Sequence, residues 1–204
     1  MPSTHPPDRP ALLIIDMVKD YFDPARPLPV TALAEEIIAP INRLSEQFRQ
    51  NGWPVIFATD SFTPQDFFFQ GKMTPHALAG TPGAEIVDAL TRTPDDLWLP
   101  KPRMSAFFGT DLDCRLLDMA VTLCAVAGIA TPYCVLTTVL DALCHDFKAV
   151  LLTDCSAAAS RELHRQTIDI YRRNPLFPLL RTMTADELVA DLVDQVPAPP
   201  QQEE

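Results

Sequence analysis

Two short apolar runs, each ending in a carboxylate and separated by an amphipathic stretch, constrain the fold of this chain most strongly. The run ALLIID covers Ala11 to Asp16, and the run PVIFATD covers Pro54 to Asp60. Continuous apolar runs of this length are typical of parallel strands that are covered on both faces. Between them, apolar residues recur at helical spacing from Thr31 to Asn51, and Gly52 follows as a stop. The pattern predicts a strand–helix–strand unit.

The remaining sequence continues this alternation and predicts one α/β domain. Strands that alternate with helices form crossover connections, so we expect a mainly parallel, doubly wound sheet in a three-layer α/β/α sandwich. The single domain is expected to span residues 10–193, between a flexible arm at 1–9 and a flexible tail at 194–204. A long ordered loop is expected at 61–82, further strands at 97–99, 121–129, 149–154 and 179–183, and further helices at 133–147, 160–173 and 185–192.

Composition narrows the kinds of partner. The 204 residues carry a formal net charge of −11, which repels the phosphate backbone of nucleic acids. No uninterrupted apolar run is long enough to span a membrane, and the N-terminal residues lack the apolar core of a secretory signal, so we expect a cytoplasmic protein. The five cysteines are an odd number without close pairs, which favours reduced thiols over a disulfide scaffold or a zinc cluster.

Four polar residues follow predicted strands, and we expect them to meet at one edge of the sheet: Asp16, Asp60, Lys101 and Cys134. Cys134 would begin a helix, whose N–H groups and dipole favour a thiolate, and the ammonium of Lys101 would lower the thiol pKa further. Asp16 could take the thiol proton and deliver it to a leaving amine. Each residue by itself also fits a structural role, as a core cysteine, a lysine whose stem lies along apolar surface, or a strand-end aspartate.

Several spaced motifs carry a resemblance to a known family. They are LLIIDMVKDYF, HALAGTPGAEIVDAL, KPRMSAFFGTDLD and GIATPYCVLTTVLDA, with DCSAAASRELHRQTID as a weaker fifth. In this order they resemble the isochorismatase-like cysteine hydrolases, the family of nicotinamidases, carbamoylsarcosine amidases and ureidoacrylate amidases. The likeness runs from about Pro10 to Leu192. It implies a catalytic triad of Asp16, Lys101 and Cys134, in agreement with the interpretation drawn from the residues themselves.

The resemblance also implies an oxyanion hole beside the nucleophile. The family has a non-proline cis peptide before the catalytic cysteine, which would join Ile129 to Ala130 here. This bond would turn the N–H of Ala130 toward the N–H of Cys134. Two such donors would stabilise the anionic oxygen of a tetrahedral intermediate.

The metal site of the family is broken in this chain. Nicotinamidases of the family hold zinc or a similar ion with an Asp-x-His pair and a later His, and the matching positions are Asp60, Phe62 and His76. Phenylalanine cannot coordinate a metal, and two protein ligands are fewer than the three that a catalytic zinc normally keeps. We therefore expect no metal and no cofactor, with a rearranged site that includes Asp66 as the alternative. His76 would bind Asp60 or a substrate, or hold the long loop.

A set of aromatic residues is the candidate substrate pocket. By resemblance, Tyr21 and Phe22 correspond to a position that stacks on the substrate, and other aromatic residues could complete a wall for a flat amide. The same residues could instead form a core patch, because Phe is mostly buried for packing. The predicted pocket residues are Tyr21, Phe22, Phe62, Phe107, Phe108 and Tyr133.

These observations predict a metal-independent cysteine amidohydrolase that cleaves a C–N bond of a small amide or N-carbamoyl compound through a thioester. One alternative is a catalytically silent, oligomeric binding protein of the same fold, which the altered Val18, Lys19 and Phe62 allow. Another is a vinyl ether hydrolase like true isochorismatases, although those lack the nucleophilic cysteine. By resemblance we expect a homo-oligomer, a dimer or tetramer, and we expect neither nucleic acid nor a membrane as a partner.

Overall fold

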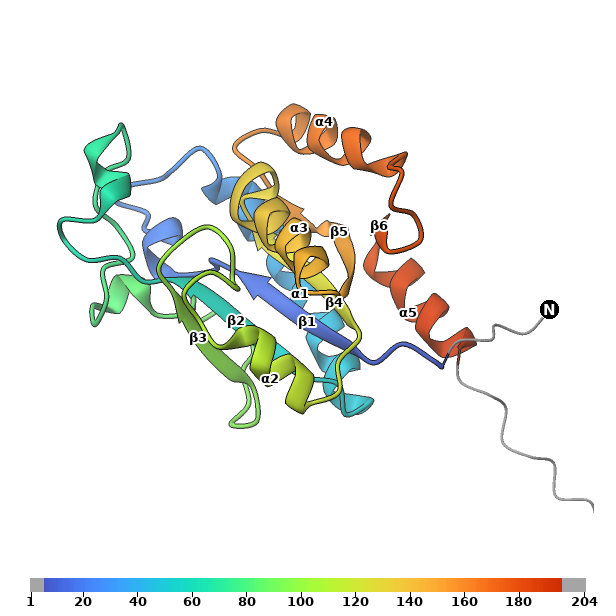
Figure 1. Cartoon of the computed structure of the whole chain (residues 1–204). Helices are drawn as coiled ribbons and strands as arrows, with labels where there is room; N and C mark the ends of the chain where they lie inside the picture. The colour runs from blue at the N-terminus through green and yellow to red at the C-terminus, as the bar shows by residue number, and fades with distance from the viewer. Residues whose placement is uncertain (1–5, 196–204) are drawn as a thin grey trace, which may run out of the picture.

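The central sheet of the described residues, 6–195, has six parallel strands (Figure 1). In this computed structural model the strands lie in the order β3-β2-β1-β4-β5-β6. The short apolar runs that predicted strands form the buried centre of the sheet. The strands are β1 (Pro10–Ile15), β2 (Val55–Asp60), β3 (Leu97–Lys101), β4 (Leu123–Ile129), β5 (Lys148–Ala157) and β6 (Leu180–Met183).

Helices cover both faces of this sheet. In β1, Leu12 and Ile14 pack toward α1 and α5, whereas Leu13 and Ile15 pack toward α2, α3 and α4. Two apolar cores therefore lie on opposite faces, which confirms the predicted three-layer α/β/α sandwich. The helices are α1 (Thr31–Gln50), α2 (Leu112–Asp118), α3 (Leu136–Cys144), α4 (Arg161–Arg172) and α5 (Ala185–Asp194). No helix of the described residues is long and apolar enough to cross a membrane.

The structure departs from the predicted elements in two helices. α2 is absent from the prediction because its seven residues bury only Leu112 and Leu116, which is too short a periodic signal. The helix predicted at 133–147 begins instead as a wide π-type turn, Thr131–Val135, and becomes regular only in α3. Pro132 stands near the start of this turn, where its missing N–H leaves no hydrogen bond unmade.

The strand order reverses between β1 and β4, and ligands of such sheets bind where this reversal occurs. Ile15 of β1 lies beside Gly128 of β4, and Asp60 of β2 lies beside Lys101 of β3. Gly128 has φ +109°, and an added Cβ would collide with the backbone of Ile15. Glycine therefore lets β4 approach β1 closely at the carboxyl edge of the sheet.

The two ends of the described chain meet at the opposite edge. The backbone N–H of Asp8 donates to the side chain of Gln195 at 2.9 Å, and the Asp8 carboxylate pairs with Lys148 at 2.8 Å. Residues 1–5 and 196–204, most of the predicted arm and tail, lie outside the described residues.

Candidate active site

Asp16 directly follows β1 and lies at the carboxyl edge of the sheet. Its φ is +54°, a left-handed conformation that aspartate tolerates better than most residues. One carboxylate oxygen accepts from the backbone N–H of Asp60 at 2.7 Å, and the other lies 2.9 Å from Lys101 Nζ. Burial, together with the Asp60 carboxylate, raises the pKa of Asp16 to about 7 against the opposing effect of Lys101. Such a carboxyl can exchange protons near neutral pH.

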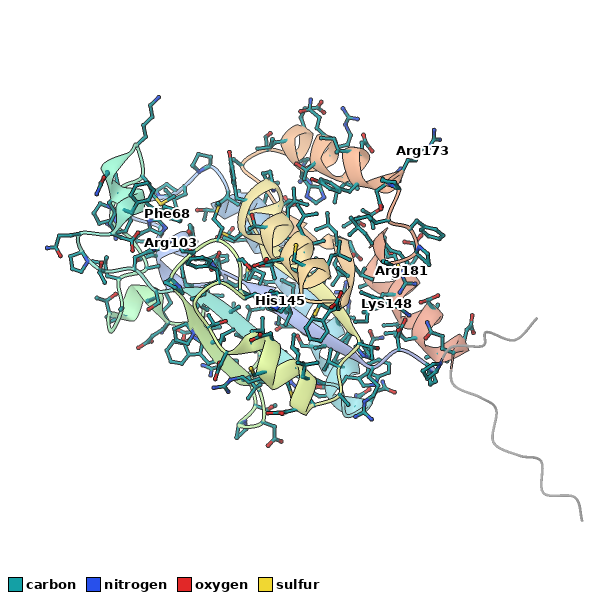
Figure 2. All side chains as sticks on the ribbon, viewed as in Figure 1. Phe68, Arg103, His145, Lys148, Arg173 and Arg181 are labelled. Carbon is teal, nitrogen blue, oxygen red and sulfur yellow. The ribbon has the colours of Figure 1, made fainter. Side chains whose placement is uncertain are left out.

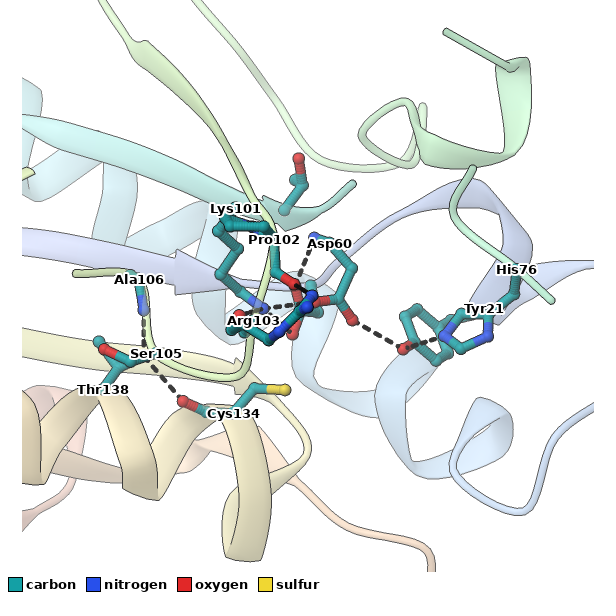
Figure 3. Close-up of polar contacts among 12 residues, drawn as sticks. Tyr21, Asp60, His76, Lys101, Pro102, Arg103, Ser105, Ala106, Cys134 and Thr138 are labelled. Carbon is teal, nitrogen blue, oxygen red and sulfur yellow. Dashed lines mark hydrogen bonds and ion pairs between the residues drawn. The ribbon is translucent and has the colours of Figure 1, made fainter. Parts of the chain in front are cut away.

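Lys101 ends β3 and is completely buried. Its Nζ lies 2.9 Å from Asp16 and 2.5 Å from Asp60, and it donates to the carbonyl of Arg103 at 3.1 Å (Figure 3). Burial by itself would lower the pKa of this ammonium, but the neighbouring carboxylates raise it above its ordinary value. Lys101 therefore stays charged, held by two hydrogen bonds and by its ion pair with Asp16.

Cys134 lies in the wide turn between β4 and α3, facing Asp16. Its Sγ and carboxylate oxygens of Asp16 and Asp60 all lie within 4.8 Å of one another. The turn follows a cis peptide bond between Ile129 and Ala130. The structure thus brings the three predicted catalytic residues together from the ends of β1, β3 and β4.

The pKa of the Cys134 thiol shifts in the opposite direction from the one expected from the sequence. Burial raises the pKa of Cys134 well above its ordinary value, and the Asp16 carboxylate raises it further, against Lys101. The predicted lowering of the thiol pKa is therefore wrong for this resting site. Desolvation and two carboxylates outweigh one ammonium, which already forms ion pairs with both carboxylates. The free site holds a neutral thiol beside a proton acceptor.

Thr138 ties Cys134 to the loop that follows Lys101, and sequence reasoning missed it. Its hydroxyl donates to the carbonyl of Cys134 at 2.8 Å and accepts from the backbone N–H of Ala106 at 3.1 Å (Figure 3). A threonine four residues after the nucleophile is a local signal for such a bond, since its hydroxyl can reach the carbonyl at i−4. On the other side of the turn, Thr131 is hydrogen-bonded to His164 at 2.8 Å.

The positions that match the metal ligands of the family form a hydrogen-bonded chain instead. The Tyr21 hydroxyl donates to Asp60 Oδ2 at 3.1 Å and lies 2.8 Å from His76 Nε2 (Figure 3). Nδ1 of His76 lies 2.8 Å from the carbonyl of Thr74. Burial raises the pKa of Tyr21 well above its ordinary value, so the phenol keeps its proton. Tyr21 therefore connects His76 to Asp60.

These residues do not fit a bound metal ion of the family type. Phe62 is 1% exposed and packs edge-on against Phe68 and His76, so it closes the place of the middle ligand. Asp60 uses one oxygen for Lys101 and the other for Tyr21. Asp66, the alternative ligand, pairs instead with Arg103 at 3.1 Å.

An apolar cavity of about 420 Å³ opens above the triad. Tyr21, Phe62 and Tyr133 line it, as predicted for the substrate pocket. Val30, Phe68, Met73, Met104 and Ile129 also line it and were missed, because nothing in their local sequence distinguishes a cavity wall from core packing.

Three of the predicted pocket residues lie elsewhere. Phe107 is buried in the core beneath α2 and α3, where it stacks on His145 with ring centres 4.9 Å apart. Phe108 is 61% exposed, and Phe22 packs against the core on the α1 side of the sheet. Predicting them as pocket residues was wrong because aromatic character does not reveal which way a side chain points.

The sequence and the fold both match known proteins. A family model described as Isochorismatase domain matches residues 10–183. A protein of Arabidopsis thaliana named a probable inactive nicotinamidase is 34% identical over 168 residues, covering 78% of this chain and 85% of the relative.

Two solved structures have a similar fold. N-carbamoylsarcosine amidase from Thermoplasma acidophilum has a TM-score of 0.76 and 26% identity, covering 87% of this chain and 97% of that one. Pyrazinamidase of Pyrococcus horikoshii in complex with zinc has a TM-score of 0.75 and 27% identity, with coverage of 86% and 99%. Both matches extend over most of the described fold.

Proposed function

This chain belongs to the isochorismatase family, and we propose that it is a cysteine amidohydrolase that cleaves a C–N bond of a small amide or N-carbamoyl compound. The observation that carries the proposal is the meeting of Cys134, Asp16 and Lys101 beneath an apolar cavity. A nucleophile, an acid–base group with a pKa of about 7 and a fixed positive charge are the groups that such a hydrolysis needs.

The first half-reaction forms a thioester. Sγ of Cys134 attacks the carbonyl carbon while the thiol proton passes to Asp16, so a C–S bond forms without a free thiolate in the resting enzyme. The carbonyl electron pair moves onto oxygen, where the N–H groups of Ala130 and Cys134 stabilise the anion as an oxyanion hole. As the C–N bond breaks, Asp16 returns the proton to the departing ammonia or amine.

The second half-reaction hydrolyses the thioester. Asp16 takes a proton from water as the water oxygen attacks the acyl carbon, and the C–S bond then breaks. The proton returns to sulfur, which restores the thiol and releases the acid. Lys101 lowers the pKa of Asp16 against the burial that raises it, and so keeps the carboxylate available as a base near neutral pH. No step requires a metal ion.

The name of the Arabidopsis relative favours a second candidate, a binding protein of the same fold without catalytic activity. The altered residues after Asp16 do not add to that case. Val18 is completely buried in a small apolar cluster, and Lys19 pairs with Glu85 and Asp88. Neither residue lines the cavity.

Two measurements on a panel of small primary amides test the proposal. Ammonia release should be detectable, and intact-mass spectrometry of acid-quenched enzyme should reveal an acyl adduct on Cys134. Cys134→Ala is expected to lose both. Cys144→Ala, which removes an exposed thiol at the end of α3, is expected to keep both. Hydrolysis retained in Cys134→Ala would contradict the proposal, and the absence of ammonia and adduct with every amide would favour the binding protein.

A further inference from the structure

The cavity above the triad selects substrates by charge as well as by size. We propose that it accepts uncharged amides with an apolar acyl group and rejects amides whose acyl group carries a carboxylate. The inference rests on the proposed amidase function and names its substrate class. It follows from which charged groups the cavity contains and whether any of them can pair with a substrate.

The charges nearest the cavity are predominantly negative. Asp16 and Asp60 line it, and Lys101 is the cation between them. With Asp16 ionised, as the proposed attack requires, two carboxylates face one ammonium. A substrate carboxylate would add a third negative charge in a largely apolar enclosure, where like charges repel more strongly than in water.

Lys101 cannot serve as the counter-ion for such a substrate. Its Nζ forms an ion pair with Asp16 at 2.9 Å and donates hydrogen bonds to Asp60 at 2.5 Å and to the Arg103 carbonyl at 3.1 Å. The side chain is completely buried and does not line the cavity. A substrate carboxylate could reach the ammonium only by displacing one of these partners.

No arginine or lysine among residues 6–195 lines the cavity. Besides Lys101, Arg103 contacts a lining residue, Phe68 (Figure 2). The Arg103 guanidinium lies 5.2 Å from the centre of the Phe68 ring and pairs with Asp66 at 3.1 Å. Its charge is therefore already matched by a carboxylate that is 8% exposed.

The rest of the wall suits an apolar acyl group. Val30, Phe68, Met73, Met104 and Ile129 present hydrocarbon and thioether surface to the cavity. Methionine side chains adapt to ligands of different shape, so linear and planar acyl groups can both pack here. The volume of about 420 Å³ is near the lower end of the range for small-molecule sites, which limits the substrate to a small amide.

Hexanamide and adipamate provide a matched pair, because both have a six-carbon acyl chain with a primary amide, and only adipamate ends in a carboxylate. Ammonia release should give a kcat/KM for hexanamide at least about a hundredfold above that for adipamate at pH 7.5. Equal values, or a preference for adipamate, would overturn the inference while leaving the amidase function intact.

A variant of the cavity wall tests the electrostatic cause. Met104 is 38% exposed, so Met104→Arg can place a guanidinium at the cavity without burying it completely. This variant should reduce the preference for hexanamide at least about tenfold, whereas the uncharged control Met104→Gln should not. An unchanged preference in Met104→Arg would also overturn the inference.

If neither amide is hydrolysed, the amidase function fails and charge selection is tested by binding. Titration calorimetry on Cys134→Ala should then detect hexanamide and not adipamate. Binding of adipamate that equals or exceeds that of hexanamide, or the absence of any binding by hexanamide, would overturn the inference independently of catalysis.

Discussion

At the scale of single residues, the proton acceptor of the proposed reaction is Asp16. Its pKa is raised to about 7, and it can take the thiol proton only when it is ionised. We therefore expect kcat/KM to rise about tenfold per pH unit toward pH 7 and to level off above it. Asp16→Asn should lose activity at every pH. A profile that stays flat between pH 5 and pH 8 would contradict the assignment of Asp16 as the base.

The hydrogen bond from Tyr21 to Asp60 allows a second test at this scale. Asp60 raises the pKa of Asp16, and the Tyr21 hydroxyl stabilises the Asp60 carboxylate with a hydrogen bond. Tyr21→Phe should leave the Asp60 charge less compensated and move the acid limb of the kcat/KM profile to higher pH. Tyr171→Phe, on α4, is the matched control and should leave the limb in place. An unshifted limb in Tyr21→Phe would show that Tyr21 affects packing only.

At the scale of elements, the catalytic geometry depends on how closely β4 approaches β1. Gly128 has φ +109°, and a Cβ there would lie against the backbone of Ile15, the residue before Asp16. Gly128→Ala should cost roughly 2 to 5 kcal/mol of unfolding free energy, through backbone strain plus a steric clash. It should also lower kcat, because β1 must shift.

Gly52→Ala is the control for this experiment. Gly52 also has a positive φ, +69°, but a Cβ there has nothing within 4 Å. Gly52→Ala should therefore lower the unfolding free energy by only about 1 kcal/mol and leave kcat unchanged. Denaturant melts and steady-state kinetics measure both effects. Equal costs for the two substitutions would show that β4 tolerates a wider spacing from β1.

The order of elements made most of the fold and the triad predictable. Short apolar runs defined the central strands, and residues at their carboxyl ends must share one edge, which brought Asp16, Lys101 and Cys134 together. The Tyr21–His76 contact was not predictable, because its partners lie far apart in the chain and have no local signature. The sign of the thiol pKa shift was missed because it depends on a sum of burial and charges that only coordinates supply.

At the scale of the whole molecule, the site should reduce stability at alkaline pH. The folded state raises the pKa of Asp16 from 3.8 to about 7, so it binds this proton more tightly than the unfolded chain does. The contribution of Asp16 to the free energy of unfolding therefore falls as pH rises from about 4 to about 7. Above pH 7 the whole destabilisation by the ionised carboxylate is present.

Thermal melts of Asp16→Asn test this linkage. The variant should melt at least about 2 °C above the parent at pH 8, and the gain should shrink as the pH approaches 4. Asp111→Asn removes an exposed carboxylate whose pKa Arg115 lowers, and it should show no such gain. A difference between Asp16→Asn and the parent that is independent of pH would contradict the linkage.

The contact between Asp8 and Gln195 has a consequence for re-engineering the chain. These residues are 187 positions apart in sequence, yet they meet at the amino-terminal edge of the sheet, away from the cavity. A short linker can therefore join residues 8 and 195 directly, and new termini can be opened in a surface loop such as 91–95. Such a circular permutant would keep every strand pair intact. A chain that begins and ends elsewhere could therefore still form the same sheet and place Cys134 in the same position.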